Sequence, residues 1–416
     1  MADPRKQTEI GEIPESWQVV RLGALLSLSS GKQRPDDLTL TPTEDRPFPV
    51  YGGNGGMGYS SRYSVETPTL VIGRVGVYSG CVHTTSGKGW ITDNALFQRD
   101  PLPGTVSLGF LAEALRMINL GSVRRAGAQP LVTQGEILQL SIALPPLDEQ
   151  AAIAAVVEPM RARAGQERAI CQKLADLRSE TMAKLFREGV RGEPVRQLNY
   201  GEAPESWKVA LLGEVAEIQT GVTKGRQLDN TDVIEVPYLR VANVQDGHLD
   251  LSEMKTIEIR RAELERYLLR ESDVVLTEGG DFDKLGRGFI WRSELPLCIH
   301  QNHVFAVRTD RTVLLPEFFA YLAQSPYGKA YFLQVAHKTT NLSCINSTKL
   351  KAFPIVLPGL EEQEQIVSIL GALDQKFQVQ QRGRVLLENL LQSLVQQLMT
   401  GAIRVNEFNG AEVSNA

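Results

Sequence analysis

The sequence predicts a mixed α/β (α+β) fold in which two globular blocks are joined by two long helices, with an internal pseudo-twofold repeat. Two repeated motifs predict this organisation. The tetrapeptide Pro-Glu-Ser-Trp ends at Trp17 and again at Trp207. A Leu-Pro-x-Leu-acid-Glu-Gln motif ends at Gln150 and again at Gln363. Solenoid repeats run about 20–50 residues, so these much longer spacings indicate a duplicated pair of domains.

The composition is that of a soluble globular protein, with 42% hydrophobic and 22% charged residues among 416. The chain contains neither a long apolar run nor an apolar segment at its N-terminus, which predicts a cytoplasmic protein without a membrane span. The separated cysteines, Cys81, Cys171, Cys298 and Cys344, are expected to be reduced and buried. Because the net charge is −5, any DNA-binding surface must be a local patch.

The first globular block is predicted to cover residues 1–146. Short β-rich runs at 69–72 and 75–78 indicate strands, and residues 110–115 indicate a short helix. The glycine-rich run at 51–58 is expected to be a loop, because glycine loses much backbone entropy in a regular element. The block is therefore predicted to contain a twisted sheet with few helices.

The first long helix is predicted over residues 147–190. Asp148 and Glu149 fall in its first turn, where the helix dipole favours negative charge, and Gly189 provides a C-terminal stop. Polar Glu167, Arg178 and Thr181 interrupt its apolar seam. Alternating steps of four and three give that seam as Ile153, Val157, Met160, Ala164, Cys171, Leu174 and Leu185.

The second block, with its linker, is predicted over residues 191–357, and the second long helix over 358–402, followed by a polar tail at 403–416. Strands are expected at 236–243 and 272–277, and a helix at 317–323. The seam of the second helix, broken at Gln380 and Arg384, consists of Ile366, Leu370, Leu373, Phe377, Leu387, Leu391, Leu394 and Leu398.

The two seams predict that the long helices pack on each other as a coiled-coil-like pair. A helix of this length spans nearly 60 Å at about 1.5 Å per residue, and its apolar stripe needs a partner. The other copy is the economical partner, in an antiparallel or crossed pair that holds the two blocks apart. The alternative is an ordinary helical hairpin within one compact core.

The duplicated ensemble of Pro-Glu-Ser-Trp start, Leu-Pro-x-Leu junction and long helix resembles the specificity subunit of Type I restriction-modification systems. The resemblance covers residues 13–403. Segments similar to two types of target recognition domain of that family lie at 72–76 and 90–95 in the first block, and at 238–244, 279–280, 286–287 and 301–303 in the second.

This resemblance implies a subunit without catalytic residues of its own. Each block would recognise one half of an asymmetric, bipartite site in double-stranded DNA. The helices would set the spacer and dock two methyltransferase subunits, which would bind S-adenosylmethionine. Whether restriction or translocase subunits join the complex stays open.

Arginine and lysine neutralise phosphates, and arginine, asparagine and glutamine contact base edges. The predicted DNA-binding residues are Arg74, Lys88, Arg124, Arg125 and Gln129 in the first block, and Lys224, Arg226, Lys284, Arg287, Lys338 and Asn341 in the second. The alternative for each is a solvated surface charge or a turn residue.

Two other classes of function stay open. An enzyme would need a site that the sequence does not reveal, since no phosphate loop is present and His300 and His303 lack further ligands for a metal. A pocket that gathers two or more carboxylates or histidines would favour an enzyme. A protein-interaction scaffold built on the helices is the third possibility.

Overall fold

In the computed structural model, the residues described are 4–118, 120–123, 131–226, 228, 232–280, 285–338 and 343–405. The chain forms two compact units. Unit 1 combines Met1–Arg168 with Arg382–Ala416, and unit 2 is Ala169–Gln381. Each unit therefore holds one globular block together with about half of each long helix.

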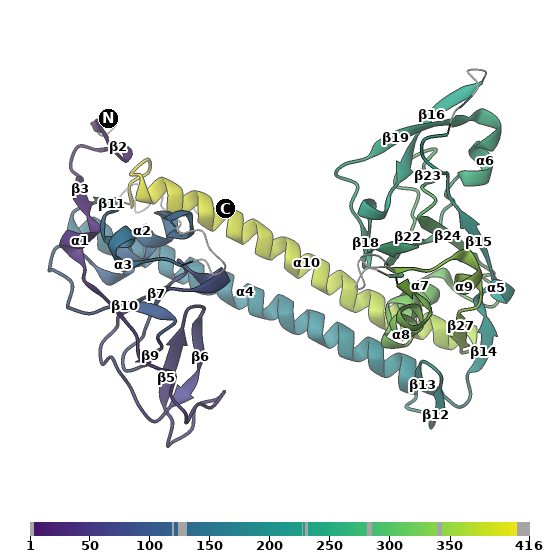
Figure 1. Ribbon diagram of the computed structural model, residues 1–416, viewed down its shortest axis with the longest axis horizontal. Helices are drawn as coiled ribbons and strands as arrows, with labels where there is room; N and C mark the ends of the chain where they lie inside the picture. The colour runs from purple at the N-terminus through teal and green to yellow at the C-terminus, as the bar shows by residue number, and fades with distance from the viewer. Residues whose placement is uncertain are drawn as a thin grey trace, which may run out of the picture. The chain divides into compact units, whose positions relative to one another are not determined.

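The long helices are α4 (Leu147–Glu188) and α10 (Leu360–Met399). Within unit 1 they are antiparallel, as Figure 1 shows: Glu149 near the start of α4 pairs with Arg404 just beyond α10, and Arg168 pairs with Glu388. Pro159 lies inside α4 without ending it. Among the described residues, no helix is both long and apolar enough to cross a membrane.

The block of unit 1 is built around a four-stranded antiparallel sheet in the order β4-β10-β7-β8, flanked by smaller sheets. Its elements are β1 (Arg5–Thr8), β2 (Gly11–Pro14), β3 (Gln18–Arg21), α1 (Leu22–Leu25), β4 (Leu28–Ser30), β5 (Phe48–Gly52), β6 (Gly55–Ser60), β7 (Leu70–Gly73), β8 (Val82–Thr84), β9 (Trp90–Ile91), β10 (Ala95–Gln98), α2 (Leu108–Ile118), α3 (Gln134–Leu138) and β11 (Ser141–Leu144), with 3-10 turns at Gly76–Tyr78 and Leu120–Val123.

Two sequence-based expectations for this block are wrong. Residues 51–58 belong to the hairpin β5–β6, in which Gly55 adopts a φ of +92° at the turn and Gly58 lies against the carbonyl of Thr39. These glycines therefore serve a tight turn and a close approach. The expected strand at 75–78 is a 3-10 turn that begins at Gly76 with a φ of +74°. The expected strand at 69–72 and helix at 110–115 are confirmed by β7 and α2.

The block of unit 2 repeats the four-stranded antiparallel sheet, in the order β15-β24-β20-β22. Its elements are β12 (Val195–Leu198), β13 (Gly201–Pro204), β14 (Lys208–Leu211), α5 (Leu212–Val215), β15 (Ala216–Thr220), β16 (Val233–Leu239), β17 (Val244–Gln245), β18 (His248–Leu249), β19 (Lys255–Arg260), α6 (Leu264–Tyr267), β20 (Val274–Thr277), β21 (Gly279–Gly280), β22 (Gly288–Ile290), β23 (Ile299–His300), β24 (Val304–Thr309), α7 (Pro316–Gln324), α8 (Pro326–Val335), β25 (His337–Lys338), β26 (Ser343–Cys344), α9 (Ser347–Lys351) and β27 (Pro354–Leu357), with 3-10 turns at Val241–Asn243 and Arg261–Glu263. The expected strand at 236–243 ends earlier, at Leu239, where a 3-10 turn follows. Strand β20 and helix α7 confirm the other two expectations.

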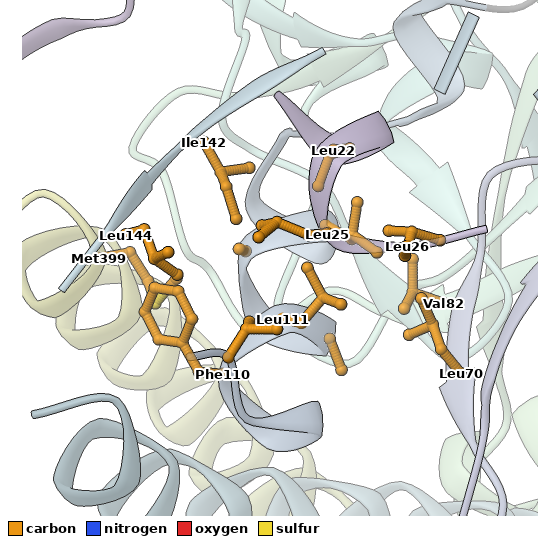
Figure 2. Close-up of a cluster of buried hydrophobic side chains, with 14 of the residues drawn as sticks. Leu22, Leu25, Leu26, Leu70, Val82, Phe110, Leu111, Ile142, Leu144 and Met399 are labelled. Carbon is orange, nitrogen blue, oxygen red and sulfur yellow. The ribbon is translucent and has the colours of Figure 1, made fainter. Parts of the chain in front are cut away.

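The hydrophobic core of each unit joins its block to its helix segments. In unit 1, Met399 of α10 packs close to Leu144 and Phe110 of the block, as Figure 2 shows. In unit 2, Phe186 of α4 and Leu370 of α10 belong to the same core as the block. The helices are thus part of both cores, since burying this apolar surface stabilises block and helix together.

The cysteine expectation holds only in part. Cys171 and Cys298 are buried, but Cys81 is half-buried and Cys344 is exposed. The expected burial of Cys344 is therefore wrong, because this residue lies on the short strand β26 at the surface.

Candidate nucleic-acid interface

A buried tryptophan fixes the start of a long helix in each unit. The indole Nε1 of Trp17 donates to Glu149 Oε2 over 2.9 Å, and that of Trp207 donates to Glu362 Oε2 over 3.1 Å. Both indoles are almost completely buried. The repeated Pro-Glu-Ser-Trp and acid-Glu-Gln motifs are therefore two halves of one contact, present once in each unit.

The glutamine of the same motif makes a second matched contact. Gln150 and Gln363 are completely buried, and each Oε1 accepts from the backbone N–H of the residue just before α2 or α7. Each Nε2 donates to two backbone carbonyls. The carbonyl partners are Pro145 and Thr105 for Gln150, and Pro358 and Val313 for Gln363. One amide thus satisfies three buried backbone groups and joins the long helix to the block.

Each tryptophan that holds the start of one long helix also lies near a glycine at the end of the other long helix. Gly189 after α4 has a φ of +68°, and Gly401 after α10 has a φ of +63°. A Cβ on Gly401 would lie 2.4 Å from Pro14 and 3.3 Å from the ring of Trp17. A Cβ on Gly189 would lie 2.7 Å from Glu362 Oε1, 3.4 Å from Pro204 and 3.7 Å from the ring of Trp207. The left-handed backbone favours glycine at both places, and at Gly401 the close approach to Pro14 requires it as well.

In each unit, polar side chains of the block bind polar side chains of the long helices. We call this contact the polar tie, and its residues differ between the units. In unit 1, the completely buried Glu113 of α2 accepts from Arg161 of α4 and pairs with Arg116. In unit 2, the hydroxyl of Tyr321 of α7 donates to Asp374 Oδ2 of α10 over 2.8 Å. Arg178 of α4 completes this tie by pairing with Asp374 and donating to Gln324 Oε1 over 3.1 Å. The polar residue Arg178, which interrupts the predicted seam, is thus accounted for.

The predicted seam faces the interior of each unit. Ile153, Val157, Leu391 and Leu398 are buried in the core of unit 1, against which Met160, Leu387 and Leu394 pack. Ile366 and Leu370 are buried in the core of unit 2, whereas Leu174, Leu373 and Phe377 are half-buried. Sequence reasoning missed four further buried residues of the long helices, which lie next to the predicted seam positions in the sequence. They are Met182, Phe186, Val395 and Met399.

The two sheets have a matching end, which we call the loop end. There Gly31 follows β4 and Gly221 follows β15. A Cβ on Gly31 would lie 2.2 Å from the carbonyl oxygen of Thr92, and one on Gly221 would lie 2.0 Å from that of His300. The two glycines are related by the same sequence offset as Trp17 and Trp207, and only glycine permits this backbone approach.

In unit 2 the loop end gathers four segments that are distant in sequence. Val222 bridges to Gln301, and Glu278 N donates to His303 O over 2.9 Å. Strand β21, directly after Glu278, pairs with β26, which pairs with β25. The other end of β24, at Thr309, leads toward α7, which contacts the start of the long helix α10.

Comparisons with known proteins identify the family. Residues 204–389 match the model of the Type I restriction modification DNA specificity domain. The Type I restriction enzyme MjaVIII specificity subunit of Methanocaldococcus jannaschii is 23% identical to this chain, over 95% of both chains. The chain is thus similar to Type I restriction-modification specificity subunits over nearly its whole length, and its residues 204–389 match their DNA specificity domain. It is therefore a DNA-recognition subunit, as the resemblance implied.

Other relatives agree with this family. The StySPI specificity subunit of Salmonella potsdam is 21% identical over 86% of this chain and 82% of its own. A relative named for the MjaX system of M. jannaschii is 26% identical over 53% of this chain, and the chain spans about half (52%) of that relative. The fold is similar to that of the S subunit from M. genitalium, with a TM-score of 0.60 and 15% identity over 92% of this chain and 96% of the other.

Several predicted DNA-binding residues of this chain can be placed, and their role stays a prediction. Arg74 directly follows β7 at the loop end of unit 1, where its Nη1 donates to Ser30 Oγ over 3.3 Å. Lys88 follows the end of β8 that lies away from the loop end. Its ammonium lies 4.6 Å from the ring centre of Tyr63. Arg74 and Lys88 are therefore not brought together.

In unit 2, Lys224 is exposed in the segment that follows Gly221. Arg226 makes two hydrogen bonds to Glu263, of 2.8 and 3.1 Å, and this partner raises the pKa of the guanidinium. Arg287 Nη1 donates to Gln245 Oε1 over 3.1 Å beside β22. The backbone of Lys338 lies in β25. Arg124, Arg125, Gln129, Lys284 and Asn341 lie outside the described residues.

Sequence reasoning missed a cluster of cations around an indole in unit 1. The ammonium of Lys32 lies 5.7 Å from the ring centre of Trp90, and the guanidinium carbon of Arg62 lies 5.5 Å from it. Such cation–π contacts are recognisable only once β9 and the segment after β4 are adjacent.

A pocket that gathers two or more carboxylates was the feature expected of an enzyme. An open hollow of about 570 Å³ in unit 2 is lined by Glu180, Glu188 and Glu202 together with Lys184 and Arg187. The hollow meets the carboxylate criterion, although its carboxylates lie among cations. Within the described part of the chain, no group of three His, Cys, Asp or Glu residues could hold a metal ion. A second open hollow of unit 2, of about 340 Å³, is lined by Glu217 and Glu265 together with Arg266, Arg270 and Arg308, and it also meets the criterion. The enzyme hypothesis can therefore be tested at both hollows.

Proposed function

We propose that the chain is the non-catalytic specificity subunit of a Type I restriction-modification complex. The block of each unit recognises one half of an asymmetric bipartite DNA site. The long helices set the spacer and dock two methyltransferase subunits. Those partners bind S-adenosylmethionine and perform the chemistry in the cytoplasm, and restriction or translocase subunits are further candidate partners.

The observation that carries this proposal is the repetition of one frame around different residues at the loop end. The tryptophan–glutamate, glutamine and glycine contacts occur in both units, whereas the side chains at the loop ends differ. Two unlike readers on one chain suit an asymmetric site, while a twofold dimer favours a palindrome. Joining the readers also makes the second binding event effectively intramolecular.

Exposed apolar side chains on the helices support a docking role. Leu386 and Leu390 of α10 are 69% and 58% exposed in unit 1. In unit 2, Val379 of α10 is 70% exposed and Leu177 of α4 is 47% exposed. Leu386 and Leu390 lie one helical turn apart, and neighbouring exposed apolar side chains support a surface that meets a partner.

The decisive experiment is co-expression of this chain with methyltransferase subunits of its own system, followed by mapping of methylated adenines on host DNA. One asymmetric bipartite motif that disappears without this chain is the expected result. The chain alone serves as the control for catalysis. Methylation or cleavage by the purified chain, lost on Glu180→Gln and Glu202→Gln, would replace the proposal with the enzyme hypothesis.

Exchanging a block or lengthening the helices tests whether the blocks recognise the half-sites and the helices set the spacer. Replacing residues 12–146 by the matching block of a relative should change one half-site and leave the other half-site and the spacer intact. Inserting one heptad after residue 168 and after residue 381 should lengthen the spacer or abolish methylation. A half-site that changes with helix length alone would contradict the assignment of spacing to the helices.

A further inference from the structure

We propose that Glu278, held by His303, determines the base recognised at one position of the second half-site. Arg74 occupies the equivalent position in unit 1 and determines a base of the first half-site. This inference rests on the proposed function, and it adds Glu278 and its contact with His303, which the sequence pattern does not single out.

The equivalence of Arg74 and Glu278 follows from their backbone contacts. Each residue is the first after an inner strand of its sheet, β7 or β20. Arg74 N donates to Asn94 O over 2.9 Å, and Glu278 N donates to His303 O over 2.9 Å. Asn94 and His303 in turn directly precede the equivalent strands β10 and β24. The four residues therefore form two matched pairs at the loop ends.

The carbonyl groups of the two residues are matched as well. Val132 N donates to Arg74 O over 3.0 Å, and Ile345 N donates to Glu278 O over 2.8 Å. Val132 and Ile345 are related by the same sequence offset that separates the junction glutamines Gln150 and Gln363. Two hydrogen bonds per residue thus fix the direction in which each side chain leaves the sheet end.

The side chains at these matched positions have opposite hydrogen-bonding character. The Glu278 carboxylate is 23% exposed and accepts at Oε2 from the Nδ1–H of His303 over 2.5 Å. The imidazole of His303 is 53% exposed. Because the histidine engages only Oε2, the other oxygen, Oε1, is the acceptor offered to a DNA donor. Arg74 offers only donors.

The negative charge of Glu278 indicates that this residue contacts a base and not a phosphate. A carboxylate beside DNA is repelled by phosphates, so Glu278 does not suit a phosphate contact. A carboxylate does accept from the N4 amino group of cytosine in the major groove, whereas arginine donates to O6 and N7 of guanine. The geometry therefore points to a cytosine opposite Glu278 and a guanine opposite Arg74.

The test compares the methylated motif of the wild-type complex with that of complexes containing Glu278→Gln or His303→Gln. Glu278→Gln conserves the size of the side chain and removes its charge. We expect this variant to relax one position of the second half-site, with the preference for the original base falling about tenfold or more. The first half-site and the spacer should not change.

Glu253→Gln is the matched control, because Glu253 is a 73% exposed carboxylate of the same unit that precedes β19. Arg74→Gln should relax only the first half-site. An unchanged motif in Glu278→Gln, or a uniform loss of binding across all sequences, would overturn the inference. A wild-type complex without any bipartite motif would instead overturn the proposed function itself, and the inference with it.

The variant His303→Gln tests whether His303 positions the Glu278 side chain or only stabilises the fold. Glutamine can still donate to Glu278, so this variant should keep the recognised base and weaken the preference less than Glu278→Gln does. A collapse of both variants with loss of thermal stability would assign the pair a structural role and contradict the inference.

Discussion

In unit 1, the carboxylate of Glu113 on the block accepts from the arginine Arg161 on a long helix, with Arg116 beside it. In unit 2 the direction is reversed, because Tyr321 on the block donates to the carboxylate of Asp374 on a long helix. Arg161 and Asp374 are related by the same sequence offset as Gln150 and Gln363, so they occupy equivalent helix positions. The same tie between block and helix is therefore made with opposite polarity.

The contacts at the junction show no such reversal. Both units use an indole that donates to a glutamate and a buried glutamine that binds three backbone groups. Backbone donors and acceptors cannot exchange roles, so a side chain that satisfies them is constrained to one chemistry. A pair of side chains requires only complementarity, and its two members can change together. This difference explains which parts of the duplicated frame stayed alike.

The largest expected effect comes from the shared glutamines. Gln150→Leu and Gln363→Leu each leave one N–H and two carbonyls buried without a partner. Each substitution should lower the free energy of unfolding of its own unit by about 3 kcal/mol. Chemical denaturation together with hydrogen exchange of α2 and α7 measures the loss in each unit.

Gln365→Leu is the control, because Gln365 is exposed two residues along the same helix. It should change the stability by less than about 0.5 kcal/mol. If only one of the two buried glutamines proved costly, the junctions would not be energetically equivalent, despite their matching hydrogen bonds.

The sequence predicted the repeat and the long helices because both depend on local patterns. The seam from Ile366 to Leu398 follows from periodicity alone, and Gly189 marks a helix end by its type. Buried Glu113 was missed, since a carboxylate in a short helix is ordinarily placed on the surface. Its burial depends on Arg161, which is distant in sequence and which only the packing of α2 on α4 brings close.

The loop ends were predictable only in part for a related reason. Glycines and basic residues indicate loops suited to DNA, but the meeting of Glu278 with His303 requires the pairing of Thr277 with Val304. That register is non-local information. The glycine-rich segment at 51–58 was misassigned because composition cannot distinguish a flexible loop from a hairpin whose glycines permit close contacts.

A second expected difference between the units concerns acid. His300 in unit 2 is completely buried and its Nδ1 contacts Val304 O, whereas the equivalent residue in unit 1 is the buried Ile91. Burial lowers the pKa of His300 to about 4. The unfolded chain, with a histidine pKa of about 6.5, therefore binds more protons between pH 4 and 6.5, and stability falls as the pH drops through this window.

We expect His300 to cost unit 2 about 2 kcal/mol of folding free energy between pH 7 and pH 5. His300→Leu should remove this increment of pH dependence, even though it alters the stability at pH 7. Unfolding curves at the two pH values, for the variant and for the wild type, measure the difference. The control Ile91→Leu should retain the wild-type dependence, and equal dependence in all three proteins would refute the assignment to His300.

The smallest expected effect tests the reversed tie itself. Tyr321→Phe removes the hydroxyl that donates to Asp374, while Arg178 remains paired with that carboxylate. Because burial raises the pKa of Tyr321, its hydroxyl keeps its proton throughout the neutral range, and the loss should not vary with pH there. The expected loss is about 1 kcal/mol, measured by denaturation of unit 2. Tyr63→Phe, on a partly exposed tyrosine of unit 1, is the control. A loss of several kcal/mol would mean that Arg178 cannot hold Asp374 alone, and that the tie in unit 2 depends on its neutral donor as strongly as unit 1 depends on its arginines.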